Sequence, residues 1–140
     1  LILGESIPKA EYLARYRVAD LFLDTHPYNA GTTASDALKM GLPMLTMKGK
    51  SYQARMGASI INAVNLPELI THSQEEYESL AIELASNPDK LKAIKEKLAS
   101  NLATAPLYDT KLFAKNIESA YTQMYERHHQ GLEPDHIYVE

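Results

Sequence analysis

Residues 21–41 read LFLDTHPYNAGTTASDALKMG, and this stretch is the most informative part of the chain. A short apolar segment ends at Asp24, a loop of turn-forming residues follows, and a helix is expected from about Thr33 to Met40. The free N–H groups and the dipole of such a helix start favour an anion, most often a phosphate. Because Asp36 follows one turn later and could accept from a sugar hydroxyl, the stretch suggests a nucleotide-diphosphate pocket. A helix that is merely capped has the same pattern.

Short apolar strands alternate with helices on both sides of this stretch. Gly41 and Pro43 are expected to end the central helix, since glycine adopts the left-handed conformation and proline cannot continue a helix. The expected strands are residues 1–3, 21–23, 44–46 and 69–70, and the expected helices are 8–17, 33–40 and 51–64. This alternation predicts an α/β fold with a short parallel sheet and flanking helices.

From residue 73 onward the pattern indicates helices alone. Ser73 and Glu76 form a capping box, and a second helix is expected to begin at Asn87 and Pro88. A third is expected from about Asp109 to residue 130. The sequence therefore predicts three parts, which are a βαβ part over residues 1–72, an all-helical C-terminal part over 73–131 and an extended tail over 132–140.

Composition limits the classes of function. The chain has 140 residues and a net charge of -4, with acidic and basic residues mixed, so nucleic acid is not expected as a partner. The absence of cysteine excludes disulfides and thiolate metal sites. No membrane-length apolar run and no signal peptide are found in the sequence, so no membrane partner is expected and the cytoplasm is the default compartment.

The run from Val18 to Ser59 carries a pattern of motifs in a fixed order. It contains an acidic strand end, an Asn-x-x-Thr-Thr loop, an Asp on the next helix and a Gly-x-Pro-x-x-Thr segment. With this pattern the chain resembles the C-terminal catalytic lobe of the O-linked N-acetylglucosamine transferase family, including its bacterial relatives with tetratricopeptide repeats. The similarity extends from near Pro8 to His136 and implies a partial Rossmann-like fold, as in the C-terminal lobe of GT-B glycosyltransferases.

The resemblance implies an activity and its partners. An inverting glycosyltransferase would move N-acetylglucosamine from UDP-GlcNAc to Ser or Thr hydroxyls of a protein acceptor. This chain would supply the C-terminal portion of the UDP-sugar-binding lobe and would be inactive alone, because the amino-terminal lobe and the repeats would lie outside it. Two alternatives stay open: a transferase of the same fold using another nucleotide sugar, and a non-catalytic docking or regulatory lobe.

The resemblance also assigns site residues, but no catalytic residue. Residues on the first helix would contact the uracil and ribose, the paired threonines would hold the diphosphate, and the carboxylate on the next helix would bind the ribose. The UDP-sugar site implied in this way consists of Lys9, Tyr12, Arg15, Gly31, Thr32, Thr33 and Asp36.

Two of these residues depart from the better-known members of the family. Gly31 and Tyr12 both replace a histidine. Because Gly31 has no side chain, assistance to the leaving group would come from elsewhere, for which His26 is a candidate, and Tyr12 leaves the identity of the nucleotide base open. A basic segment, Lys48 to Arg55, follows the third expected strand and suits an anionic donor. For Arg55 itself we favour a role in supporting the fold.

Neither a cofactor nor a metal is expected. His128 and His129 are adjacent on the last helix and would point about 100° apart, and no other residues complete a zinc set. A different expectation concerns residues 1–3, which would form a sheet edge. If this edge is unpaired, self-association through it is predicted.

Overall fold

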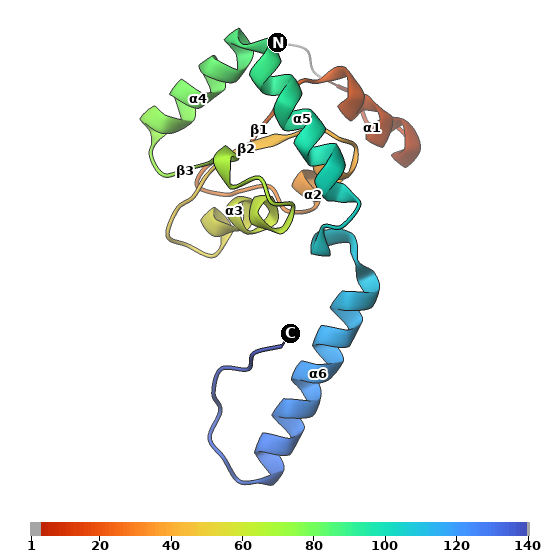
Figure 1. Cartoon of the computed structure of the whole chain (residues 1–140), viewed down its shortest axis with the longest axis vertical. Coiled ribbons are helices and arrows are strands. Elements are labelled where there is room, and N and C mark those ends of the chain that lie inside the picture. Colours follow the sequence, from red (N-terminus) through yellow and green to blue (C-terminus); the bar gives the residue numbers. More distant parts are fainter. Residues whose placement is uncertain (1–3, 140) are drawn as a thin grey trace. The chain divides into compact units, whose positions relative to one another are not determined.

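The computed structural model describes residues 4–139 and divides into two compact units, with the boundary between Ala105 and Pro106 (Figure 1). The first unit contains the sheet and the helices that surround it. The second contains the last long helix and the tail. The strand expected at residues 1–3, and with it the predicted self-association, lies outside the described residues.

Strands and helices alternate in the first unit in the predicted order, so the α/β class is confirmed. Its regular elements are α1 (Lys9–Arg15), β1 (Phe22–Leu23), α2 (Thr32–Lys39), β2 (Met44–Met47), α3 (Gln53–Ala63), β3 (Ile70–Thr71), α4 (Gln74–Ser86) and α5 (Pro88–Leu102). Two 3-10 turns are also present. The first, η1 (Tyr16–Val18), follows α1, and the second, η2 (Pro67–Leu69), precedes β3.

The three strands form a parallel sheet in the order β1-β2-β3. Phe22 pairs with Met44, and Thr46 pairs with Ile70. Helices α3 and α4 both pack on β2, and Figure 1 draws α4 above the strands and α3 below them. Because both faces are covered, Met44, Leu45 and Thr46 are fully buried, as expected of the central strand of a parallel sheet.

The end of the sheet differs from the sequence expectation. The last strand was expected at residues 69–70 but begins at Ile70, because Pro67–Leu69 forms a 3-10 turn that buries Leu69. Helix α4 then returns across β2 and β3 and packs on α5. The compact unit therefore continues past residue 72 and includes the first two helices of the helical part.

The predicted helix ends carry the hydrogen bonds that such residues make. Ser73 Oγ accepts from the N–H of Glu76 at 3.2 Å, while the Glu76 carboxylate accepts from the N–H of His72 at 2.7 Å, one residue earlier than a standard capping box. Asn87 Oδ1 accepts from the N–H of Lys90 at 3.0 Å. Gly41 adopts the left-handed conformation with φ of +83°, as predicted for the end of α2.

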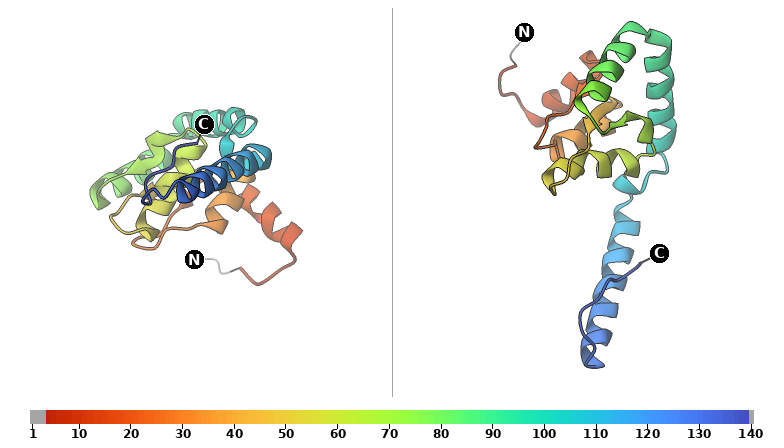
Figure 2. Two further views of the ribbon diagram at one scale, coloured as in Figure 1. Left: turned by 90° about the horizontal axis from the view of Figure 1, so that it is seen from below. Right: turned by 90° about the vertical axis from the view of Figure 1, so that its left-hand side faces the viewer.

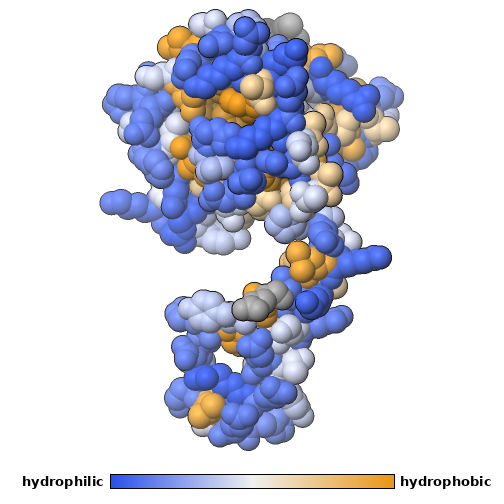
Figure 3. Space-filling model, in the orientation of Figure 1, coloured by the Kyte–Doolittle hydropathy of each residue, from blue (hydrophilic) through white to orange (hydrophobic). Residues whose placement is uncertain are grey.

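The second unit consists of η3 (Pro106–Tyr108), α6 (Thr110–His129) and a tail without regular structure over residues 132–139 (Figure 2). Asp109 caps α6 by accepting from the N–H of Leu112 at 2.9 Å. The helix has no buried residues, and Figure 3 shows patches of apolar surface on this unit between hydrophilic side chains. Within the described part of the chain, no helix is both long enough and apolar enough to cross a membrane.

Candidate functional site

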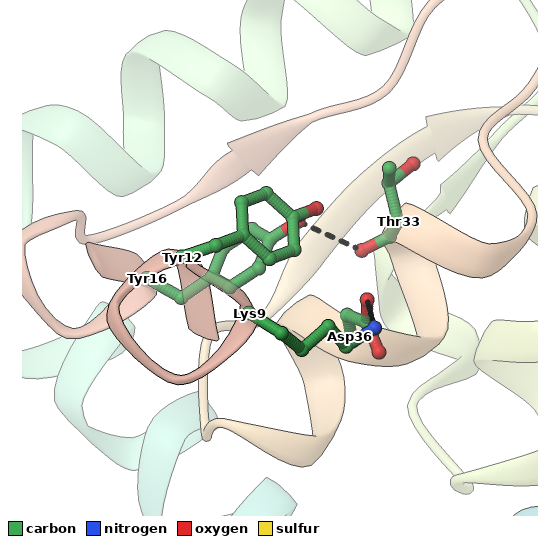
Figure 4. Close-up of polar contacts among 5 residues, drawn as sticks. All are labelled: Lys9, Tyr12, Tyr16, Thr33 and Asp36. Atoms are coloured by element: carbon green, nitrogen blue, oxygen red, sulfur yellow. Dashed lines mark hydrogen bonds and ion pairs between the residues drawn. The ribbon is translucent and has the colours of Figure 1, made fainter. Parts of the chain in front are cut away.

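Helices α1 and α2 meet through an ion pair between two predicted site residues. Lys9 Nζ lies 3.3 Å from Asp36 Oδ2, although the two residues are 27 positions apart in the sequence (Figure 4). The Lys9 side chain is 69% exposed and that of Asp36 is 19% exposed. The carboxylate is thus partly enclosed but still reachable from solvent.

A second link between the same helices runs through two tyrosines. The Tyr16 hydroxyl donates to the backbone carbonyl of Thr33 at 3.4 Å, and it is also hydrogen-bonded to the Tyr12 hydroxyl. Since the Tyr16 proton is directed to the carbonyl, the Tyr12 hydroxyl is the donor between the two phenols. Their rings meet edge-on with centroids 5.3 Å apart. Helix α2 is thereby attached at two points, to α1 through Lys9 and to the following turn η1 through Tyr16.

Tyr16 was not assigned to the site from the sequence. The spacing in the sequence could have indicated this role, because Tyr16 follows Tyr12 by four residues and a helix would place both on the same side. Burial raises the pKa of Tyr16 most strongly, and the hydrogen bond to Tyr12 and the negative charge of Asp36 raise this pKa further. The hydroxyl therefore stays protonated at neutral pH and can keep donating to Thr33.

Tyr16→Phe is expected to lower the free energy of unfolding by about 1 kcal/mol, because the Thr33 carbonyl loses its donor and the Tyr12 hydroxyl loses its acceptor. Tyr121→Phe is the control, since Tyr121 is exposed on α6 and forms no hydrogen bond in the described structure. Urea unfolding of the chain measures both variants. Because the pKa of Tyr16 is raised above the ordinary value of 10.0, its contribution should be full below pH 10.0 and decrease above it. Equal stabilities of Tyr16→Phe and the unchanged chain at neutral pH would contradict the assigned bond.

The start of α2 is open to an incoming group. Thr32 and Thr33 are the first two residues of the helix, and both are exposed. Among the described residues no side chain caps this helix. Its first N–H groups and the two threonine hydroxyls are therefore available to an anion.

Gly31 precedes the helix with φ of -106°, which is not in the left-handed region that favours glycine. A Cβ added there would meet no atom within 4 Å. Packing within this unit therefore does not require a glycine, and a side chain at this position would have room.

Two side chains that the sequence analysis related to the site, Arg15 and His26, contact other parts of the structure. The Arg15 guanidinium donates to the carbonyl of Glu5 at 3.1 Å and forms no hydrogen bond or ion pair with Asp36 or Thr33, so its assignment to the site stays a prediction. His26 lies against Gly49, since a Cβ at Gly49 would be 3.0 Å from His26 Cε1. No hydrogen bond or ion pair joins His26 to Thr32 or Thr33.

The loop that leads into α2 is held by a buried carboxylate. Asp24 is only 6% exposed and accepts three hydrogen bonds. The donors are the N–H of Thr25 at 2.9 Å, the N–H of Ala30 at 2.8 Å and the hydroxyl of Thr46 at 2.6 Å. This one side chain closes the loop from residue 25 to residue 30 and fixes it to β2.

Asn29 completes the same network from within the loop. Its amide donates to the carbonyl of Thr25 at 2.8 Å, and its side-chain oxygen accepts from the N–H of Gly57 on α3 at 3.3 Å. The hydroxyl of Tyr77 on α4 donates to the carbonyl of Asp24 at 2.9 Å. The sequence showed Asp24 and Asn29 as motif positions, but their buried structural role follows only from these contacts.

The basic segment after β2 has a supporting arginine. The Arg55 guanidinium donates to the carbonyl of Lys50 at 2.5 Å, and Ser51 Oγ accepts from the N–H of Ala54 at 3.2 Å. These bonds agree with the favoured role of Arg55 in the fold and with capping by Ser51. Within residues 4–139 there is no group of three His, Asp or Glu side chains that could hold a metal ion.

The fold and this site define a class of protein. An open parallel sheet with a free helix start at the carboxyl end of a strand is typical of α/β domains that bind nucleotides at that edge. The chain belongs to glycosyl transferase family 41, whose family model matches residues 1–117.

Similar proteins of known name cover nearly the whole chain. This chain is 36% identical over 140 residues to the probable UDP-N-acetylglucosamine–peptide N-acetylglucosaminyltransferase SEC of Arabidopsis thaliana. The match covers 99% of this chain and 14% of that protein. The corresponding enzyme of Caenorhabditis elegans is 32% identical over 137 residues, which covers 98% of this chain and 12% of that protein.

A solved structure shares the fold. A mutant O-GlcNAc transferase of Thermobaculum terrenum matches with a TM-score of 0.80 and 34% identity, over 85% of this chain and 23% of that one. The chain thus spans less than a quarter of the length of each of these relatives.

Proposed function

We propose that this chain is part of an inverting glycosyltransferase that moves N-acetylglucosamine from UDP-GlcNAc to Ser or Thr hydroxyls of proteins. Membership of family 41 supports a glycosyltransferase, and the names of the relatives support the donor and the peptide acceptor. The chain would supply the nucleotide-diphosphate site of a longer protein. Alone, it is expected to bind UDP weakly and to transfer no sugar.

The observation that carries this proposal is the contact between Lys9 and Asp36. It brings the first helix, which would hold the base and ribose, next to the helix start that would hold the diphosphate. In this assignment Thr32 and Thr33 bind the diphosphate, and Asp36 accepts from a ribose hydroxyl. Lys9 and Tyr12 lie on the adjacent helix, on the side of the uracil and ribose.

The proposed chemistry is a direct displacement at the anomeric carbon. The acceptor hydroxyl attacks that carbon and gives up its proton to water, the bond to the β-phosphate oxygen breaks, and UDP leaves with growing negative charge. N–H groups and hydroxyls at the start of α2 would stabilise this charge, because they are already oriented before the reaction. Gly31 offers only its backbone at the position where better-known members carry a histidine.

Asp36→Asn is expected to weaken UDP binding about tenfold. The carboxylate accepts from the ribose hydroxyl as a charged group, and an amide in its place loses about 1.4 kcal/mol of that interaction. Calorimetric titration of UDP into the full-length protein that carries this chain measures the change. An unchanged affinity would show that the ribose assignment is wrong.

The matched control for this experiment is Asp20→Asn. The Asp20 side chain is 81% exposed and pairs with Lys95 at 2.7 Å on the surface, so the same change of charge there should leave UDP affinity unaltered. Titration of GDP and ADP in parallel tests which nucleotide base the site prefers, because Tyr12 leaves the identity of that base open. Tighter binding of either nucleotide than of UDP would favour a different donor.

A non-catalytic lobe is the second candidate, and Gly31 is the residue that favours it. A Cβ at Gly31 would meet no atom within 4 Å, so no neighbouring group fills the position of a β-carbon there. Sugar transfer by the full-length protein, lost in a Thr33→Ala variant that still folds, would exclude this candidate. Absence of transfer together with intact UDP binding would support it.

A further inference from the structure

A pocket of about 570 Å³ lies at the carboxyl ends of all three strands. Its lining includes His26 after β1, the segment from Lys48 to Ser51 after β2, and His72 after β3. Ligands of open parallel sheets bind at this edge. Three separate loops build the pocket, so its lining depends on the sheet and not on one local turn.

The pocket carries excess positive charge. The ammonium groups of Lys48 and Lys50 have no ion-pair or hydrogen-bond partner among residues 4–139, and no Asp or Glu belongs to the described lining. Nearby, the Glu76 carboxylate accepts from the backbone N–H of His72, and Asp24 already accepts three hydrogen bonds. The local field therefore favours an anionic ligand.

The polar side chains of the lining favour an anion over a neutral sugar. They are two ammonium groups, two imidazoles and the hydroxyl of Ser51, which already accepts from the N–H of Ala54. A sugar hydroxyl also needs acceptors, which carboxylate and amide side chains commonly supply. Neither kind is present in the described lining, and the two ammonium groups favour a carboxylate or phosphate.

The pocket is separate from the proposed diphosphate site but shares a loop with it. His26 lines the pocket, and the same loop continues through Asn29 into the start of α2 at Thr32. A polypeptide that presents a hydroxyl to a sugar on the diphosphate must approach this edge of the sheet. Because the pocket and the start of α2 share this loop, a residue close in sequence to that hydroxyl is placed to reach the pocket.

Resting on the proposed function, we propose that this pocket binds an acidic side chain of the protein acceptor, close in sequence to the hydroxyl that receives the sugar. Lys48 and Lys50 would bind the carboxylate, and they would determine which acceptors are preferred. They would take no part in the displacement at the anomeric carbon.

Binding of two labelled peptides to the full-length protein, followed by fluorescence anisotropy, tests this proposal. The peptides share one serine and differ only in having glutamates or glutamines beside it. We expect the glutamate peptide to bind about fivefold more tightly at low salt and the difference to shrink as salt screens the charges. In the double variant Lys48→Gln/Lys50→Gln, the preference for the glutamate peptide should disappear.

The control is Lys111→Gln/Lys115→Gln on α6, which removes the same charge outside the pocket and should keep the preference. Equal binding of both peptides by the unchanged protein, or a preference that persists in the Lys48/Lys50 variant, would overturn the proposal.

UDP affinity of the Lys48/Lys50 variant should be unchanged, and a fivefold loss would mean that the pocket holds the donor diphosphate instead. If the unchanged protein fails to bind UDP, the proposed function fails, while the peptide comparison still reports on the pocket.

Discussion

Gly57→Ala is expected to lower the free energy of unfolding by about 3 kcal/mol. A Cβ at Gly57 would lie 2.5 Å from Asp24 Oδ2 and closer still to Thr46 Oγ1. These two atoms form the buried hydrogen bond of 2.6 Å between β1 and β2. Overpacking a core costs about 1–3 kcal/mol, breaking the bond adds about 1–3 kcal/mol, and the helical preference of alanine returns about 1 kcal/mol.

Thermal unfolding of the chain, followed by circular dichroism, measures this loss. Gly31→Ala is the matched control, since the same added methyl group meets no atom within 4 Å there. That variant should change stability by about 1 kcal/mol at most, through the weaker capping of alanine. If Gly57→Ala is as stable as the unchanged chain, α3 does not lie so close to the Asp24–Thr46 bond.

Asp24→Ala is expected to destabilise the fold by about 3 kcal/mol as well. The N–H groups of Thr25 and Ala30 and the hydroxyl of Thr46 would all lose their acceptor. Each buried donor left without a partner costs about 1–3 kcal/mol, and movement of the loop toward water would recover part of this loss. Urea unfolding of the chain measures the change in stability.

A second readout separates this role from general loss of stability. Because the network holds the loop that leads into α2, UDP affinity of the full-length protein should fall under conditions in which Asp24→Ala is still folded. Asp20→Ala, an exposed carboxylate on the surface, should change stability by about 0.5 kcal/mol or less and leave UDP binding intact. A stable Asp24→Ala variant with normal UDP affinity would contradict the role of the network.

Local patterns predicted most of the secondary structure. Gly41 ends α2 in the left-handed conformation, and Ser73, Asn87 and Asp109 each accept the hydrogen bond expected of a helix cap. These features depend on residues within about one turn of each other, so the sequence displays them directly. The last strand was placed one residue early because the 3-10 turn at Pro67–Leu69 buries an apolar side chain in the same way as a strand.

The candidate site was predictable in part. The motif around Asp36 indicated an anion site at the start of a helix, and the resemblance to a family supplied the residues on the first helix. The sequence did not show that Tyr16, rather than Arg15, contacts the start of α2. Arg15 is the last residue of α1 and Tyr16 is the first of η1, so their different partners depend on how this segment packs.

The sequence alone determined the alternation of strands and helices, the helix ends and the chemical character of the loop before α2. Only the tertiary structure decided which of these groups meet. Lys9 reaches Asp36 across 27 residues, Thr46 reaches Asp24 across 22, and Tyr77 reaches Asp24 across 53. Such contacts form when parallel strands bring distant segments to one edge of a sheet, and no local pattern encodes their geometry.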